Sequence, residues 1–123
     1  MDNCTLDAIL KGRLMSGDCP SRDVLRHLTS RWGFLVMLAL ESGTLRFSQV
    51  RNTIGGISER MLAETLQVLE GDGFVLRTAL PVVPPHVEYT LTPLGVEAVG
   101  LMRQLGDWLE GALPRIMAAR QAA

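Results

Sequence analysis

Four side chains near the start of a predicted helix combine hydrogen-bonding groups with apolar surface. In the stretch "GISERMLAETLQVLEGDGFV" (residues 56–75), leucines recur at helical spacing and predict one buried face. The outward face presents Ser58, Arg60, Met61 and Thr65 near its start. A guanidinium can pair with guanine O6 and N7, a hydroxyl can bond to several base edges, and apolar atoms can contact the thymine methyl group. These residues are therefore candidates for contact with DNA bases.

The elements around this helix give it a context. Ser58 suits its N-cap and a glycine its end, so we expect a helix over residues 59–70. A short helix with one buried face, "FSQVRNTI", precedes it and two glycines turn the chain between them. The segments "FVLRTA" and "VEYTLT" alternate as two strands, and the prolines of "LPVVPPH" favour a projecting loop between them. Two helices, a turn and a β-hairpin are the order of a winged helix-turn-helix.

Three further helices are expected around this unit. One begins at Pro20, and a central core helix, apolar nearly all round, ends at Gly43. A long C-terminal helix begins at Pro93, and Gly106 and Pro114 predict that it bends or breaks near its end. The expected fold is α+β but mostly α: a winged helix-turn-helix with a two-stranded wing and dimerisation helices at both ends.

The length of 123 residues suits one domain. We expect an N-terminal arm or helix over residues 1–18, the winged helix-turn-helix core over residues 19–92, and a dimerisation helix and tail over residues 93–123. With 47% hydrophobic and 20% charged residues, the composition is globular. No apolar run approaches the length of a membrane span and the start lacks a signal-peptide pattern, so we expect a cytoplasmic protein without membrane contact.

The net charge of −1 is low for a DNA-binding domain, but its distribution is uneven. Residues 21–60 contain 6 basic and 3 acidic side chains, whereas residues 61–123 contain 4 and 7. Positive charge is thus concentrated in the segment that carries the predicted helix-turn-helix.

Other polar residues would contact the DNA backbone. Gln49, Arg46 and Arg51 lie on or beside the helix before the turn and are expected to touch phosphates. Arg77 on the first strand and His86 near the loop would lie along the backbone or in the minor groove.

The C-terminal helix predicts a dimer. Its apolar surface is wider than one small domain needs, and a twofold interface would cover it and place two base-reading helices about one DNA turn apart. The candidate interface residues are Val99, Met102, Leu105, Trp108 and Leu109.

A series of short motifs carries a family resemblance. The pieces "RF", "GIS", "ML", "TL", "LE", "DG" and "VEY-LT-LG" follow one another in order, and matching stretches cover nearly all of residues 19–110. The chain resembles the HxlR-type transcriptional regulators, a branch of the MarR-like winged-helix proteins. The resemblance implies a homodimer that binds palindromic operator DNA through paired recognition helices and wings and usually represses neighbouring genes.

The resemblance also gives Cys19 a candidate role. Several relatives use an N-terminal cysteine followed by proline to sense oxidants, quinones or aldehydes, so an oxidant or small-molecule effector is implied. A helix N-terminus favours the thiolate, but nearby Asp18 and Asp23 oppose it. The other cysteine, Cys4, lies upstream of the matching region, and bonding of Cys19 between subunits is one alternative. A buried cysteine with no sensing role is the other.

Other function classes find little support. The sequence has no paired-histidine motif, phosphate-binding glycine loop or serine elbow, so we expect no enzyme, and no cofactor or metal site. A winged-helix module that binds only proteins is the main alternative, because fold does not fix function.

Overall fold

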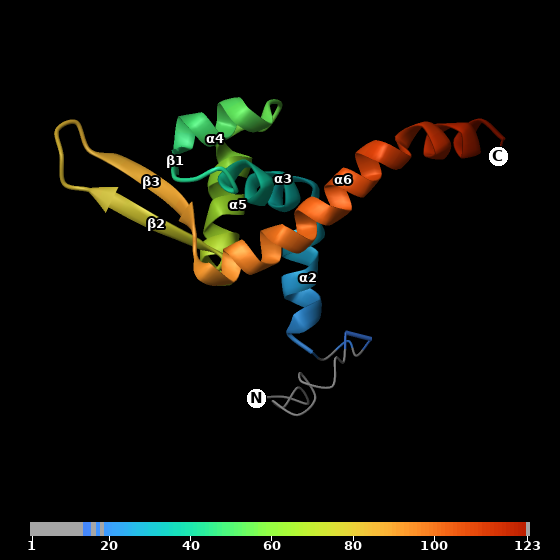
Figure 1. Cartoon of the computed structure of the whole chain (residues 1–123). Coiled ribbons are helices and arrows are strands. Elements are labelled where there is room, and N and C mark those ends of the chain that lie inside the picture. Colours follow the sequence, from blue (N-terminus) through green and yellow to red (C-terminus); the bar gives the residue numbers. More distant parts are fainter. Residues whose placement is uncertain (1–13, 16, 18, 123) are drawn as a thin grey trace.

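The computed structural model of the chain describes residues 14, 15, 17 and 19–122. Within this part, five helices and a small antiparallel sheet form the fold; the β2–β3 hairpin projects from one side of the helices, and the last helix extends away on the other (Figure 1). Most of the predicted N-terminal arm lies outside the described residues. The elements are α2 (Ser21–Thr29), α3 (Arg31–Leu40), β1 (Leu45–Arg46), α4 (Phe47–Ile54), α5 (Glu59–Gly71), β2 (Val75–Leu80), β3 (His86–Leu91) and α6 (Pro93–Ala122).

Helix α3 forms the centre of the core, as its apolar sequence predicts. Val36, Met37 and Leu40 are almost fully buried on it. The side chain of Ser30 accepts a hydrogen bond from the backbone N–H of Gly33 and caps the start of the helix. None of the nine residues of α2 is fully buried, so α2 packs against α3 at the periphery.

The helix-turn-helix is formed by α4 and α5. Val50 of α4 and the leucines of α5 are buried in the common core, which confirms the predicted inward faces. Gly55 and Gly56 have φ angles of 71° and 80° in the connecting turn. Residues with a side chain rarely adopt these angles, so the glycine pair permits the sharp change of direction.

The sheet contains one more strand than expected. The hairpin of β2 and β3 forms the predicted wing and pairs from Val75 opposite Leu91 to Leu80 opposite His86. The extra strand is β1, which adds to β3 in the order β1-β3-β2. The prediction missed β1 because a two-residue strand is too short to show an alternating pattern.

Helix α6 begins at Pro93, as predicted, and continues to Ala122. The hydroxyl oxygen of Thr92 accepts a hydrogen bond from Gly95 N at 3.0 Å, which caps the helix at Pro93. The helix runs without a break through Gly106 and Pro114, although its axis changes direction near the C-terminus (Figure 1). No helix among the described residues is long and apolar enough to span a membrane.

Candidate nucleic-acid interface

The N-terminal end of α5 is open to solvent and its start is well defined. Ser58 is the N-cap, because its side chain accepts a hydrogen bond from Met61 N at 3.1 Å. Leu62, Leu66 and Leu69 are buried on the opposite face and fix the helix to the core. The predicted base-reading face therefore points away from the body on a rigid support.

Two of the four candidate base-reading residues lie at the side of this face. Met61 is exposed, and Thr65 is half-buried with its hydroxyl donating to Met61 O at 2.7 Å. The hydroxyl hydrogen of Thr65 is thus used within the helix, and its oxygen and methyl group remain for an external contact. Met61 and Thr65 line a mainly apolar hollow between α5 and the end of α2, together with Ser30 and Val68.

Arg60 is a highly exposed charged residue of the candidate set. Its side chain is 89% exposed, and Nε donates to Glu64 Oε1 at 3.2 Å one turn along the helix. The i,i+4 spacing of Arg60 and Glu64 favours such an ion pair on a helix. An exposed pair of this kind contributes only about 0–1 kcal/mol, so Arg60 can change partners at low cost.

The expected phosphate-binding residues of α4 form bonds within the chain. Gln49 Oε1 accepts from Arg46 N at 2.8 Å, across the first turn of α4. Arg51 donates to the carbonyl of Ile57 and pairs with Glu59 Oε1. The sequence does not predict these three contacts, because residue type alone leaves both side chains free on the surface.

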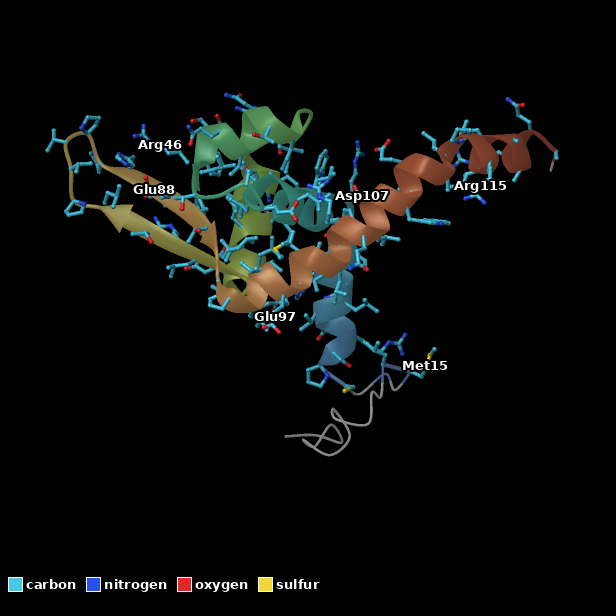
Figure 2. All side chains as sticks on the ribbon, viewed as in Figure 1. Met15, Arg46, Glu88, Glu97, Asp107 and Arg115 are labelled. Carbon is cyan, nitrogen blue, oxygen red and sulfur yellow. The ribbon has the colours of Figure 1, made fainter. Side chains whose placement is uncertain are left out.

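Basic and acidic side chains lie close together on the wing and on the adjacent strand β1. Arg46 lies opposite Glu88 in the sheet (Figure 2), and His86 Nε2 lies 3.9 Å from Glu88 Oε2. Arg77 is exposed on β2 and lines a hollow with Gln67 of α5. The wing and α5 thus face a common space in which Arg77 is the basic group.

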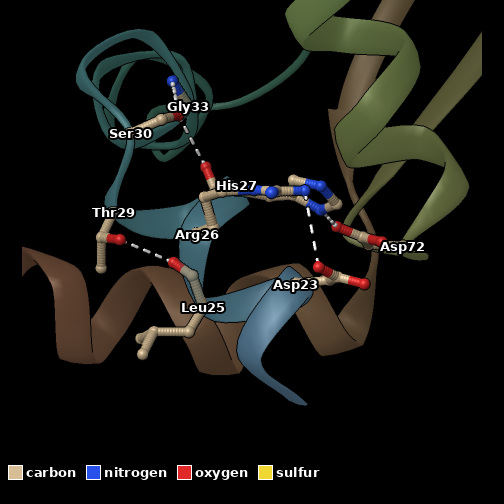
Figure 3. A network of polar contacts seen from close by, with 8 residues as sticks. All are labelled: Asp23, Leu25, Arg26, His27, Thr29, Ser30, Gly33 and Asp72. Atoms are coloured by element: carbon tan, nitrogen blue, oxygen red, sulfur yellow. Dashed lines mark hydrogen bonds and ion pairs between the residues drawn. The ribbon is translucent and has the colours of Figure 1, made fainter. Parts of the chain in front are cut away.

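A second polar network fixes α2 to the far end of α5. His27 Nδ1 lies 2.6 Å from Asp72 Oδ2, and Asp72 is the C-cap of α5 (Figure 3). The two residues are 45 positions apart in the sequence, so this contact is a tertiary one. Arg26 beside it pairs with Asp23 at 3.5 Å.

The candidate redox residue is buried at the start of α2. Cys19 is 4% exposed and takes part in a disulfide. Cys4 lies outside the described residues. Among the described residues, no group of three His, Cys, Asp or Glu side chains could hold a metal ion.

The candidate dimer residues divide into two groups. Val99 and Met102 are buried in the protomer's own core, so assigning them to the interface does not fit the structure. The first half of α6 packs on α3 and β3, which turns these two side chains inward. Leu105, Trp108 and Leu109 are exposed, and they continue a stripe with Leu101, Leu113 and Met117.

A comparison with protein families identifies this arrangement. The model for the HxlR-like helix-turn-helix matches residues 27–117, which include the helix-turn-helix, the wing and most of α6. The chain belongs to the HxlR-like helix-turn-helix family. This family consists of transcriptional regulators, not enzymes, and its helix-turn-helix implies a DNA partner.

Individual relatives agree with this assignment. The chain is 54% identical to the HTH-type transcriptional regulator YtfH of Escherichia coli over 121 residues, which are 98% of this chain and 96% of the relative. The structure of a transcriptional regulator YtfH from Salmonella typhimurium superimposes with a TM-score of 0.83 at 55% identity, covering 88% of this chain and 96% of that one. The redox regulator HypR in its oxidised form gives a TM-score of 0.70 at 33% identity, covering 76% and 96%.

Proposed function

We propose that the protein is a cytoplasmic repressor that binds inverted-repeat operator DNA as a homodimer. Helix α5 would lie in the major groove and the β2–β3 wing beside it on the backbone or in the minor groove. The observation that carries this proposal is the exposed N-terminal end of α5, which Ser58 caps while the opposite face is buried. Membership of a family of transcriptional regulators supports the same conclusion.

Arg60 is the residue that we expect to contribute most to sequence reading. A bidentate contact of arginine with guanine discriminates by about 1–3 kcal/mol, which exceeds the cost of separating an exposed pair such as Arg60 with Glu64. Ser58, Met61 and Thr65 add a hydroxyl and apolar surface on the same end of the helix. The contact set therefore favours guanine next to a base with an apolar edge, such as thymine.

Contacts with the DNA backbone would come from residues on the elements that flank α5. Arg46 and Arg77 are exposed and would bind phosphates, with His86 as a further contact near the wing loop. The side-chain oxygen of Gln49 accepts a hydrogen bond from Arg46 N, but the side-chain NH₂ group can still donate to a phosphate. Such contacts set the position of the protein and carry no sequence information.

The exposed apolar stripe of α6 supports the homodimer. Leu105, Trp108 and Leu109 lie near the middle of α6, and the later part of this helix extends beyond the body of the protomer (Figure 1). A second copy related by a twofold axis would cover this stripe and give each operator half-site its own α5.

We further propose that Cys19 makes DNA binding sensitive to oxidants. Its disulfide at the start of α2 and the similarity to the redox regulator HypR favour this role. Oxidation of two thiols releases two protons and passes two electrons to an added oxidant such as diamide. If Cys19→Ser protein responds to diamide in DNA binding as the parent does, a small-molecule effector becomes the better account.

Selection of duplexes from genomic DNA by the purified, reduced protein tests the main proposal. We expect enrichment of an inverted repeat with half-sites about one helical turn apart. Arg60→Ala should then weaken operator binding about 5- to 150-fold and relax selection at one base per half-site. Arg115→Ala is the matched control, because Arg115 lies at the distant end of α6 (Figure 2). Absence of any enriched duplex would favour a protein-binding module instead.

A further inference from the structure

Arg51 connects three parts of the helix-turn-helix through one guanidinium group. It lies in the last turn of α4, and its Nε donates to Ile57 O at 3.2 Å in the connecting turn. Its Nη1 lies 3.0 Å from Oε1 of Glu59, the first residue of α5. A single side chain of the first helix thus holds both the turn and the start of the second helix.

The turn that Arg51 holds has few other constraints. Gly55 and Gly56 both adopt positive φ angles, and a Cβ added to either glycine would meet no heavy atom within 4 Å. Glycine has the largest conformational freedom of any residue, so the pair by itself would permit several entry directions for α5. Ile57 is buried next to them and anchors the turn from its side chain. The hydrogen bond from Arg51 fixes the backbone carbonyl of Ile57, so both the side chain and the backbone of this residue are held.

The charge of Arg51 is already balanced within the protein. Glu59 supplies a carboxylate at 3.0 Å; the Arg51 side chain is 43% exposed and that of Glu59 is 74% exposed. A phosphate contact from this side chain would have to compete with an existing ion pair and a carbonyl bond. The fork geometry of arginine suits such a two-point connection, whereas lysine offers a single point charge.

We propose that Arg51 is a positioning residue that sets the direction of α5, not a ligand of a DNA phosphate. This inference rests on the proposed DNA-binding function, because it concerns how the base-reading face is held. Loss of the connection leaves α5 folded but variable in direction, so contacts with DNA bases are weakened more than contacts with the DNA backbone. Arg51 therefore determines sequence discrimination without touching a base.

Binding of operator and scrambled duplexes over a range of salt concentrations separates the two roles. For Arg51→Gln we expect a 10- to 100-fold loss on the operator, a change below twofold on the scrambled duplex, and an unchanged salt slope. Arg51→Lys should recover only part of the loss. If Arg51 bound a phosphate, Arg51→Gln would instead weaken binding to both duplexes equally and lower the salt slope by about 0.9 per protomer. That result would overturn the proposal. Arg46→Gln is the control that should lower the slope.

Hydrogen exchange of the free protein tests the connection without DNA. In Arg51→Gln protein, amides of residues 55–62 should exchange at least tenfold faster, while those of the α3 core keep their protection. Unchanged exchange in the turn would refute the positioning role even if no operator is found. If the parent protein binds no duplex but the turn loosens as expected, the DNA-binding proposal fails and the connection stands.

Discussion

Replacement of Trp108 by alanine should dissociate the proposed dimer. Trp108 is 59% exposed in the protomer, which leaves about 120 Å² of its side chain open. Covering this surface at about 25 cal/mol per Å² contributes about 3 kcal/mol per protomer, or about 6 kcal/mol in a twofold dimer. Ordering of the side chains offsets part of this gain. We therefore expect the Kd of dimerisation to rise by about two to four decades, at 1.4 kcal/mol per decade.

Sedimentation velocity over a concentration series measures this change directly. The matched control is Val83→Ala, because Val83 is a 99% exposed apolar residue in the wing loop, away from α6. The control should sediment as the parent does. If Trp108→Ala and the control both keep the parent's monomer–dimer equilibrium, this face of α6 is not the interface. A parent protein that stays monomeric at all concentrations would refute the dimer itself.

Two further predictions concern the supports of α5. Gly95→Ala should lower the free energy of unfolding by about 2 kcal/mol, because a Cβ there would lie 2.1 Å from the Phe74 carbonyl oxygen. The control is Gly100→Ala on the same helix, because a Cβ at position 100 would enter open space. This change should raise the free energy of unfolding, measured in urea, by about 0.5–1 kcal/mol. Equal effects of the two changes would contradict the packing argument. A double-mutant cycle of His27→Ala and Asp72→Ala should give a coupling of about 1 kcal/mol, since the bond is 2.6 Å long and half-buried. Additivity of the two changes would show that it contributes nothing.

Much of the fold follows from local sequence signals. The spacing of Leu62, Leu66 and Leu69 predicts the buried face of α5, and Ser58 predicts its first turn. The alternating segments before and after the prolines predict β2 and β3. These signals are strong because each covers several residues of one regular element. The two-residue strand β1 has no such repeat, and its pairing depends on where β3 lies.

The candidate site was predicted less completely than the fold. Side-chain types identify Arg60, Arg51 and Gln49 as polar and near the turn, but not which of them is engaged within the chain. Arg51 reaches Ile57 and Glu59 only because the turn folds them back toward α4. Likewise, His27 and Asp72 are 45 residues apart and meet because α2 and α5 both pack against α3.

The sequence by itself determined the order of the helices and of the two wing strands, the inward faces of α4 and α5, and the family to which the chain belongs. Those properties depend on spacing along one helix or strand, which short-range sterics and burial of apolar side chains dictate. The tertiary structure decided which faces stay open. It placed Val99 and Met102 in the protomer's core and left Leu105, Trp108 and Leu109 exposed. The reason is that the first part of α6 packs on the protomer, whereas the rest of the helix extends past it. A helical stripe looks the same in sequence whether its partner is the same chain or another, and only packing distinguishes them.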